Sequence, residues 1–402
     1  MKPLVSIFID GLKPESIQWM PFLNSLPHKK RLETILGYSV TCHASMYTGV
    51  YPAKHGLWLL WQRSPETSPF RWLDQVPLKF LGDHIPGWRI AHKLTRQPKD
   101  LTAYWGIPRL YNLPLKYWPD IDVAEHKYWD EDEYLHGYPT IFEHLRRCKI
   151  PYDVVGMVPH VIDTSRIVAE HEFDEIRPWT YLFIGDVDAL SHHYTQESTE
   201  VIKKLKDFDK IISTSCEAIQ SKIGDYDLMV WSDHGHVHLN EKIDLYQVFR
   251  SAGDNLNNYL HLIDINLARF WFKNDSERKQ VIQVLSRISN GRILTDDDLI
   301  NEHVFVPDHR YGELVFYLDS GSAFSRTIFG FGLRQHSIHG YLPVHAGCDG
   351  VFLTNLELSD QIDKVRLVDL LPSHLSLFDI PIPSGLDGRV IWRQNGQVHQ
   401  TN

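Results

Sequence analysis

The chain has 402 residues and a formal net charge of −10, with 43% apolar and 23% charged residues. This composition is typical of a globular protein, and the negative charge argues against a nucleic-acid polymer as the main partner, because phosphate backbones bind basic surfaces. The sequence contains no run of about 18 apolar residues, so we expect no membrane span. The four cysteines show no CxxC spacing and the apolar N-terminal run is too short for a signal peptide, so we expect a cytoplasmic protein with reduced thiols.

Four apolar runs that each end in polar residues predict buried parallel strands. They are Leu4–Asp10, Tyr152–Val158, Tyr181–Asp188 and Tyr226–Gly235. Between the last two runs, apolar residues recur every three or four positions over residues 199–225, which predicts an amphipathic helix. Strand, helix and strand in this order predict an α/β fold with a mostly parallel sheet, whose sites lie beyond the carboxyl ends of the strands.

Two segments interrupt this pattern. Residues 58–135 are rich in Trp, Tyr and Pro and are predicted to form an insertion, whose aromatic rings either line a substrate pocket or pack against the sheet. Residues 246–335 predict a small α+β subdomain. The α/β core is then assembled from residues 1–57, 136–245 and 336–402.

Aspartate and histidine side chains gather at the predicted strand ends. Asp188 and His192 are four residues apart, so on a helix they would share one face and could hold one metal ion. Carboxylate and imidazole groups suit zinc and similar divalent ions, and six ligands suit two centres that share a nucleophile or a phosphate oxygen. The six candidates are Asp10, Asp188, His192, Asp233, His234 and His339.

The order of these motifs resembles the alkaline phosphatase superfamily, and in particular its type I phosphodiesterase/nucleotide pyrophosphatase branch. It comprises an early Asp, a hydroxyl-rich segment before "TGVYPAKHG", then D-x-x-x-H, "DHG" and "HGY". The end of the chain, "VRLVDLLPSHLSLFDIPIPSGLDGR", is similar to the end of superfamily members, so the resemblance spans nearly the whole chain. It implies a three-layer fold in which helices cover both faces of a mostly parallel central sheet, with inserted subdomains.

The resemblance also implies two metal ions, most simply two Zn²⁺, with Mn²⁺ as the alternative. One ion would be held by Asp188, His192 and His339. The other would be held by Asp10, Asp233 and His234.

The same alignment of motifs places Ser39 at the nucleophile position, where the phosphodiesterase branch usually has Thr. Thr41 is the alternative nucleophile. Attack by Ser39 would give a phosphoserine intermediate that water then cleaves.

The chain departs from the family pattern at Cys42, where members often have an Asn that binds a phosphoryl oxygen. A thiol is a poor donor, so a backbone N–H at a helix N-terminus is expected to supply this contact. Cys42 and His236 are candidates for a second layer of residues around the site. A sulfatase function is excluded, because neither "CHASM" nor "SVTCH" contains the C/S-x-P-x-R signature.

We therefore expect a metal-dependent phosphodiesterase that acts on a small phosphorylated nucleotide, sugar or lipid head group. Three alternatives stay open: a phosphomonoesterase, a phosphotransferase that passes the phosphoryl group to a sugar or lipid alcohol, and a non-catalytic protein that binds a phosphorylated ligand. The sequence predicts no oligomeric state.

Overall fold

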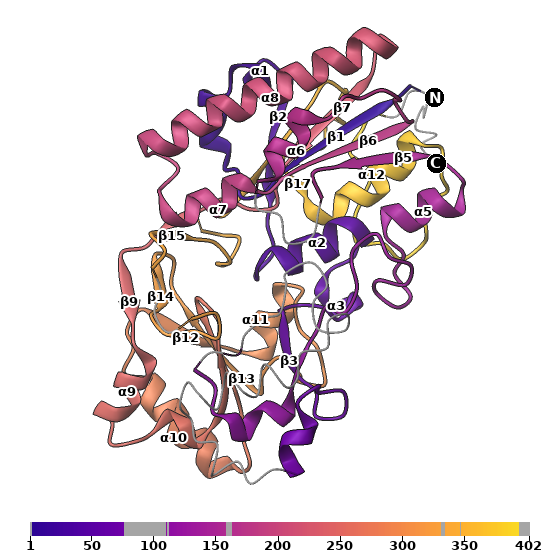
Figure 1. Ribbon diagram of the computed structural model, residues 1–402. Coiled ribbons are helices and arrows are strands. Elements are labelled where there is room, and N and C mark those ends of the chain that lie inside the picture. Colours follow the sequence, from indigo (N-terminus) through magenta and orange to yellow (C-terminus); the bar gives the residue numbers. More distant parts are fainter. Residues whose placement is uncertain are drawn as a thin grey trace, which may run out of the picture.

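A seven-stranded sheet forms the centre of the computed structural model, which describes residues 2–75, 110, 112–157, 163–330, 334–345 and 347–393. Strand β16 runs antiparallel to its neighbours β2 and β7, whereas the other neighbouring strands are parallel (Figure 1). The mostly parallel sheet predicted from the apolar runs is thus confirmed. In spatial order its strands are β17 (Val365–Arg366), β2 (His28–Glu33), β16 (Gly350–Thr354), β7 (Asp227–Trp231), β1 (Leu4–Ile9), β6 (Trp179–Ile184) and β5 (Tyr152–Val155).

Helices cover both faces of this sheet, because the central strands are apolar on both sides. On β1, Val5 and Ile7 pack toward one helical layer, and Leu4 and Phe8 pack toward the other. The first layer contains α1 (Pro21–Asn24), α6 (Thr164–Glu170) and α8 (Thr199–Ile223), and the second contains α2 (Ser39–Thr48), α5 (Ile141–Arg147) and α12 (Leu370–Leu377). The three-layer architecture is therefore confirmed (Figure 1).

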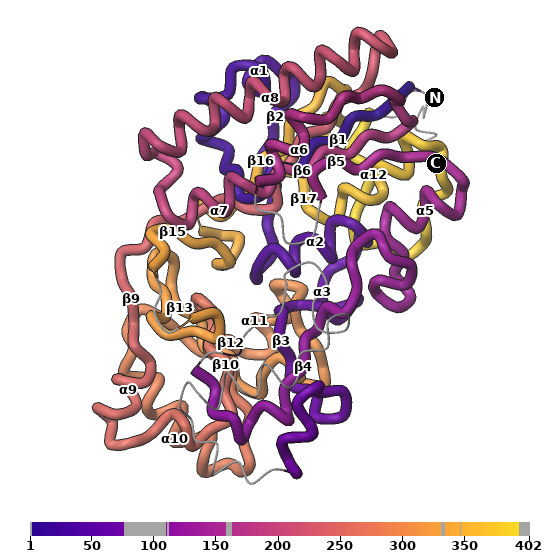
Figure 2. The backbone as a smooth tube through the Cα atoms, viewed as in Figure 1, coloured from indigo at the N-terminus to yellow at the C-terminus, as the bar shows by residue number. Residues whose placement is uncertain are grey.

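A second, antiparallel sheet lies beyond the carboxyl ends of the central strands (Figure 2). Its strand order is β10 (Leu260–Ile263), β11 (Leu267–Trp271), β13 (Leu314–Leu318) and β12 (Gly291–Leu294), and α9 (Leu245–Ser251), α10 (Asp275–Leu285) and α11 (Asp296–Asn301) belong to the same part of the chain. Within the described residues, this sheet and these helices fall inside the segment predicted to form an α+β subdomain, except that α9 begins one residue earlier. The division of the chain into domains stays a prediction.

The described aromatic residues of the 58–135 segment serve as packing residues. Strands β3 (Trp61–Arg63) and β4 (Ile121–Val123) pair, and Trp61, Phe70 and Trp118 form a buried cluster with residues such as Leu262 and Trp271 of the second sheet. This cluster packs on the second sheet, whereas Trp129 of the same segment packs on the central sheet, with its ring centroid 6.0 Å from that of Phe183 on β6, so the packing interpretation is supported for both sheets. Residues 76–109 and 111 of this segment lie outside the described residues.

The predicted elements agree with the structure except at their ends. Helix α8 starts at Thr199 as predicted and ends at Ile223, two residues before the predicted end, and the Ser198 side chain accepts a hydrogen bond from the Val201 N–H at its start. Strand β6 ends at Ile184, so Asp188 lies on the following helix α7 (Asp186–His193). Val158, the predicted end of another strand, lies outside the described residues. All four cysteines are free, and none of the described helices is both long and apolar enough to cross a bilayer.

Candidate functional site

Two aspartates meet where neighbouring parallel strands end. Asp10 follows β1 directly, and Asp233 comes two residues after β7. The Gly11 N–H lies 3.3 Å from Asp233 Oδ1 and donates a hydrogen bond to it. Gly11 has φ = 72°, and a Cβ atom there would lie 3.0 Å from both Asp188 Cβ and His236 Nε2. Glycine is therefore required here by the backbone conformation and by the close approach of α7.

The first predicted ligand group forms around helix α7. Asp188 and His192 lie one turn apart on α7, with His192 Nε2 3.5 Å from Asp188 Oδ1. His339 follows strand β15 (Ser337–Ile338), and its Nε2 lies 3.6 Å from the same carboxylate oxygen. One potential ligand atom from each residue lies within 4.8 Å of the others. We call Asp188, His192 and His339 the first trio.

The second predicted group forms between β1 and β7. His234 Nε2 lies 3.5 Å from Asp10 Oδ1 and 3.4 Å from Asp233 Oδ2. We call Asp10, Asp233 and His234 the second trio; its ligand atoms also lie within 4.8 Å of one another. The His234 and His339 rings stack at a centroid distance of 3.6 Å, so the two trios are immediate neighbours. The structure thus brings all six predicted ligands together in the predicted groups.

Backbone carbonyls orient two of the histidines. His234 Nδ1 lies 3.1 Å from Gly235 O, and His192 Nδ1 lies 3.0 Å from Ser337 O. With Nδ1–H as the donor in each case, the lone pair of each Nε2 faces the carboxylates. This is the tautomer that presents Nε2 to a metal ion.

The chemistry of the cluster fits divalent cations. Two buried carboxylate oxygens, Asp10 Oδ1 and Asp233 Oδ2, and the buried ring nitrogen His339 Nδ1 have no hydrogen-bond partner among the described residues. Burial, followed by the charges of Asp233 and Asp188, raises the pKa of Asp10 well above its usual range, and burial with the Asp188 charge raises the pKa of Asp233 to about 7. Because carboxylates in this position repel one another, positive charge between them would stabilise their ionised forms.

Ser39 lies at the edge of this cluster, as predicted. It is the first residue of α2, is 6% exposed, and its hydroxyl lies 3.2 Å from His234 Nε2. The first backbone hydrogen bonds of α2 run from the N–H groups of Thr41 and Cys42 to Tyr38 O, so the N–H groups of Ser39 and Val40 precede this first turn of bonds.

The two other polar residues of this turn are engaged elsewhere. The Thr41 hydroxyl is fully buried and donates to Trp58 O, so the geometry does not favour Thr41 as the alternative nucleophile. Cys42 Sγ lies 3.7 Å from Thr34 Oγ1, and burial raises the pKa of the Cys42 thiol well above its usual range. Cys42 is therefore a neutral packing residue next to the site.

Two residues that shape the site, His43 and Tyr38, were not predicted from the sequence. His43 is fully buried, and its Nε2 lies 3.7 Å from Asp233 Oδ2; its position four residues after Ser39, on the same helix face, was the available signal. Tyr38 precedes α2, and its hydroxyl donates to Asn266 Oδ1 at 2.6 Å. That bond ties the start of α2 to the second sheet, and no local pattern indicated it.

Asp186 and His193, which lie near the predicted ligands in the sequence, are not placed to bind a metal ion. Asp186 accepts hydrogen bonds from the Thr164 hydroxyl and the Ser165 N–H at the start of α6, and so has a structural role. His193, next to His192, is exposed.

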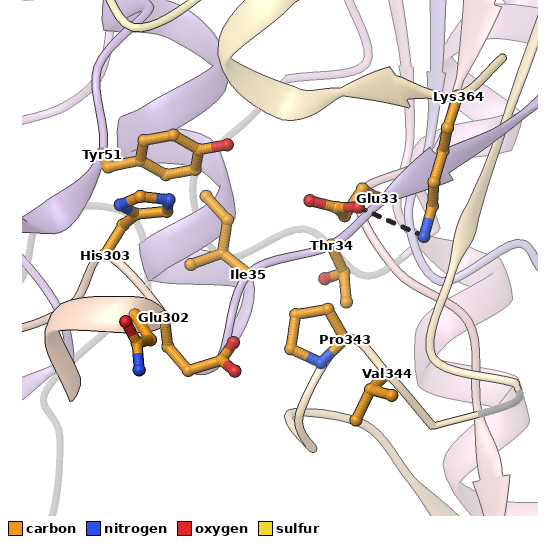
Figure 3. Close-up of a pocket in the computed structure, with 10 residues that line it drawn as sticks. Glu33, Thr34, Ile35, Tyr51, Glu302, His303, Pro343, Val344 and Lys364 are labelled. Carbon is orange, nitrogen blue, oxygen red and sulfur yellow. Dashed lines mark ion pairs between the residues drawn. The ribbon is translucent and has the colours of Figure 1, made fainter. Parts of the chain in front are cut away.

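A cavity of about 320 Å³ lies outside the cluster (Figure 3). The Tyr51 and His303 rings stack at 4.4 Å on one side, and Lys364 pairs with Glu33 at 3.4 Å on the other. Its remaining lining residues are Thr34, Ile35, Asn301, Glu302, Pro343 and Val344. Neither Ser39 nor any of the six ligands lines it, so it is not part of the candidate metal centre.

Metal affinity at the second trio is expected to depend on pH. Since the pKa of Asp233 is about 7 without metal, protons compete with a cation below that pH, whereas burial lowers the pKa of His234 to about 4, where it does not compete. We expect Zn²⁺ affinity to rise at least about tenfold per pH unit from pH 5 to pH 7 and to level off above. Competition titrations with a chromophoric chelator would measure this, and constant affinity from pH 5 to pH 7 would contradict it.

Comparisons with known proteins give a family and similar folds. The family model described as type I phosphodiesterase/nucleotide pyrophosphatase matches residues 4–342. Human ectonucleotide pyrophosphatase/phosphodiesterase 5 has a similar structure, with a TM-score of 0.68, 14% identity and 97% coverage of each chain.

The murine protein of the same name is similar too, with a TM-score of 0.65 and 14% identity over 95% of this chain and 96% of the other. An inactive murine variant in complex with AMP has a TM-score of 0.66 and 13% identity, with the same coverage. Comparison with curated protein sequences finds no match.

Proposed function

The chain belongs to the type I phosphodiesterase/nucleotide pyrophosphatase family and is thus a phosphoric ester hydrolase, and on this premise we propose that Ser39 is its nucleophile in a two-metal site. The observation that carries the proposal is the position of the Ser39 hydroxyl, 3.2 Å from His234 Nε2, at the start of a helix and beside two groups of metal-binding residues. The resemblance seen in the sequence, to the alkaline phosphatase superfamily, is confirmed at the level of the family.

In the proposed reaction, Ser39 Oγ attacks the phosphorus atom and the bond from phosphorus to the leaving oxygen breaks. This gives phospho-Ser39, which water hydrolyses to release the phosphoryl product and restore the hydroxyl. The N–H groups of Ser39 and Val40 and the helix dipole at the start of α2 favour negative phosphoryl oxygens. They are our candidates for the contact that an Asn makes in other family members.

The six ligands would hold two divalent cations, one in each trio. When bound, the ions would lower the pKa of the Ser39 hydroxyl and neutralise charge on the phosphoryl oxygens. Mixed carboxylate and imidazole ligands support Zn²⁺ as the first choice and Mn²⁺ as the second.

We propose a small nucleotide as the substrate class. The similarity to a murine structure solved with AMP supports a nucleotide for this chain, and the net charge of −10 argues against a polynucleotide. Sugar or lipid phosphodiesters remain competing substrates within the same chemistry.

The test uses metal-stripped protein with and without added Zn²⁺ or Mn²⁺. We expect metal-dependent hydrolysis of bis-(p-nitrophenyl) phosphate, with slower turnover of p-nitrophenyl phosphate and none of p-nitrophenyl sulfate. Faster turnover of the monoester would assign a phosphomonoesterase instead. Transfer of the phosphoryl group to added glycerol in preference to water would assign a phosphotransferase. Metal binding without any turnover would indicate a binding protein.

A further inference from the structure

His236 is a buried histidine that contacts the first trio without belonging to it. It is 4% exposed, and its Nε2 lies 2.9 Å from Asp188 Oδ1, closer than either His192 or His339 comes to that oxygen. A carboxylate oxygen accepts hydrogen bonds, so at this distance His236 Nε2–H is the donor and Asp188 Oδ1 the acceptor.

Ser337 holds the other side of the same ring. Its hydroxyl proton faces two acceptors, His236 Nδ1 at 3.3 Å and Ser191 O on α7, and is shared between them. Its carbonyl is the acceptor for His192 Nδ1, and its strand β15 leads directly to His339. Ser337 thus contacts α7, which carries Asp188 and His192, and lies two residues before His339.

The backbone makes room for this arrangement. His236 follows the ligand His234 by two residues, and Ser337 reaches it because β15 pairs with β8 (Val237–His238). A Cβ atom at Gly11 would come within 3.0 Å of His236 Nε2, so the glycine after Asp10 also admits the imidazole.

We propose that His236 and Ser337 are a positioning pair that fixes the Asp188 carboxylate and the His192 ring and so sets the metal affinity of the first trio. The proposal deepens the proposed function and rests on it, because it requires a metal ion at that trio. Residues that orient metal ligands in this way typically contribute about 10–100-fold to metal affinity. The second trio has its own orienting contacts and should be unaffected.

Two substitutions of His236 distinguish its two ring nitrogens. In Gln the side-chain amide lies near the position of Nε2, which faces Asp188, and in Asn it lies near the position of Nδ1, which faces Ser337. We expect His236→Asn to weaken Zn²⁺ binding at one of two sites by about 10–100-fold, and His236→Gln to weaken it by no more than about threefold. Ser337→Ala should weaken the same site by about tenfold.

The measurement is a competition titration of metal-stripped protein with Zn²⁺ and a chromophoric chelator, which resolves the two sites without reference to turnover. His238→Gln is the matched control, because His238 is exposed and lies directly opposite Ser337 in the strand pair. The melting temperatures of the metal-free variants verify that each one folds.

Two results would overturn the proposal: unchanged affinity in both His236→Asn and Ser337→Ala, or equal losses in His236→Gln and His236→Asn. Equal losses would mean that the imidazole itself is needed, as for a direct ligand in the group of Asp188, His234 and His236. If wild-type protein binds no metal at all, the proposed function fails. If the wild-type protein binds two ions and either of these two results is obtained, only the positioning role fails.

Discussion

Ser39→Ala is expected to lower kcat for a phosphodiester substrate by at least about 10⁴-fold, because no other hydroxyl of the α2 N-terminus is placed to attack. The Ser39 hydroxyl lies at the cluster, whereas the Thr41 hydroxyl is bonded to Trp58 O. Turnover of bis-(p-nitrophenyl) phosphate by metal-loaded protein would measure the loss. Metal content should stay near that of the wild type, since Ser39 belongs to neither trio.

Two matched variants control this experiment. Ser39→Thr keeps a hydroxyl at the same position and should retain measurable activity, while Thr41→Ser keeps the hydroxyl that bonds Trp58 O and should leave kcat nearly unchanged. Trapping labelled phosphoserine at Ser39 after an acid quench would support the covalent step directly. Full activity in Ser39→Ala would reject the proposed nucleophile.

Asp233→Asn is expected to have opposite effects on function and stability. It removes a ligand from the second trio, so activity should fall by at least about 10³-fold and one metal ion should be lost. The metal-free variant should nevertheless melt above metal-free wild type, by about 1–4 °C at pH 8, because a repelling buried carboxylate has been neutralised. The Asn carbonyl can still accept the bonds that Gly11 and His234 donate to Asp233 Oδ1.

The sign of the pH dependence follows from the raised pKa of Asp233. Between its usual value of 3.8 and about 7, the folded metal-free protein holds a proton that the unfolded chain has released. Its stability relative to Asp233→Asn therefore falls as pH rises through that window, and the advantage of the variant is full above about pH 7. Thermal unfolding in the presence of a chelator at pH 5 and pH 8 would measure the difference.

Asp186→Asn supplies the matched control for the same substitution. Asp186 accepts bonds at the start of α6 and belongs to neither trio. We expect this variant to bind both ions with wild-type affinity, yet to melt a few degrees lower. An increase in stability from Asp186→Asn, or no increase from Asp233→Asn, would show that carboxylate repulsion is not the cause.

The fold was predictable where the pattern is local. Apolar runs that end in Asp mark strands buried on both faces, and the periodicity of residues 199–223 marks α8. The antiparallel direction of β16 was not predictable, because Gly350–Thr354 is as buried as the parallel strands β1 and β6, and direction depends on the path of the chain. The packing of Trp61 and Trp118 on the second sheet likewise required long-range contacts.

By itself, the sequence determined the family and the six metal-ligand candidates, because ligand types and their order are properties of the chain alone. Spacing also placed Asp188 and His192 on one helix face. Tertiary structure decided where each side chain points. The Thr41 hydroxyl bonds to Trp58 and the Ser39 hydroxyl faces His234, although Ser39 and Thr41 are only two residues apart. It also brought Ser337 to His236, about a hundred residues away, because strand pairing and not sequence spacing determines which polar groups meet in a buried site.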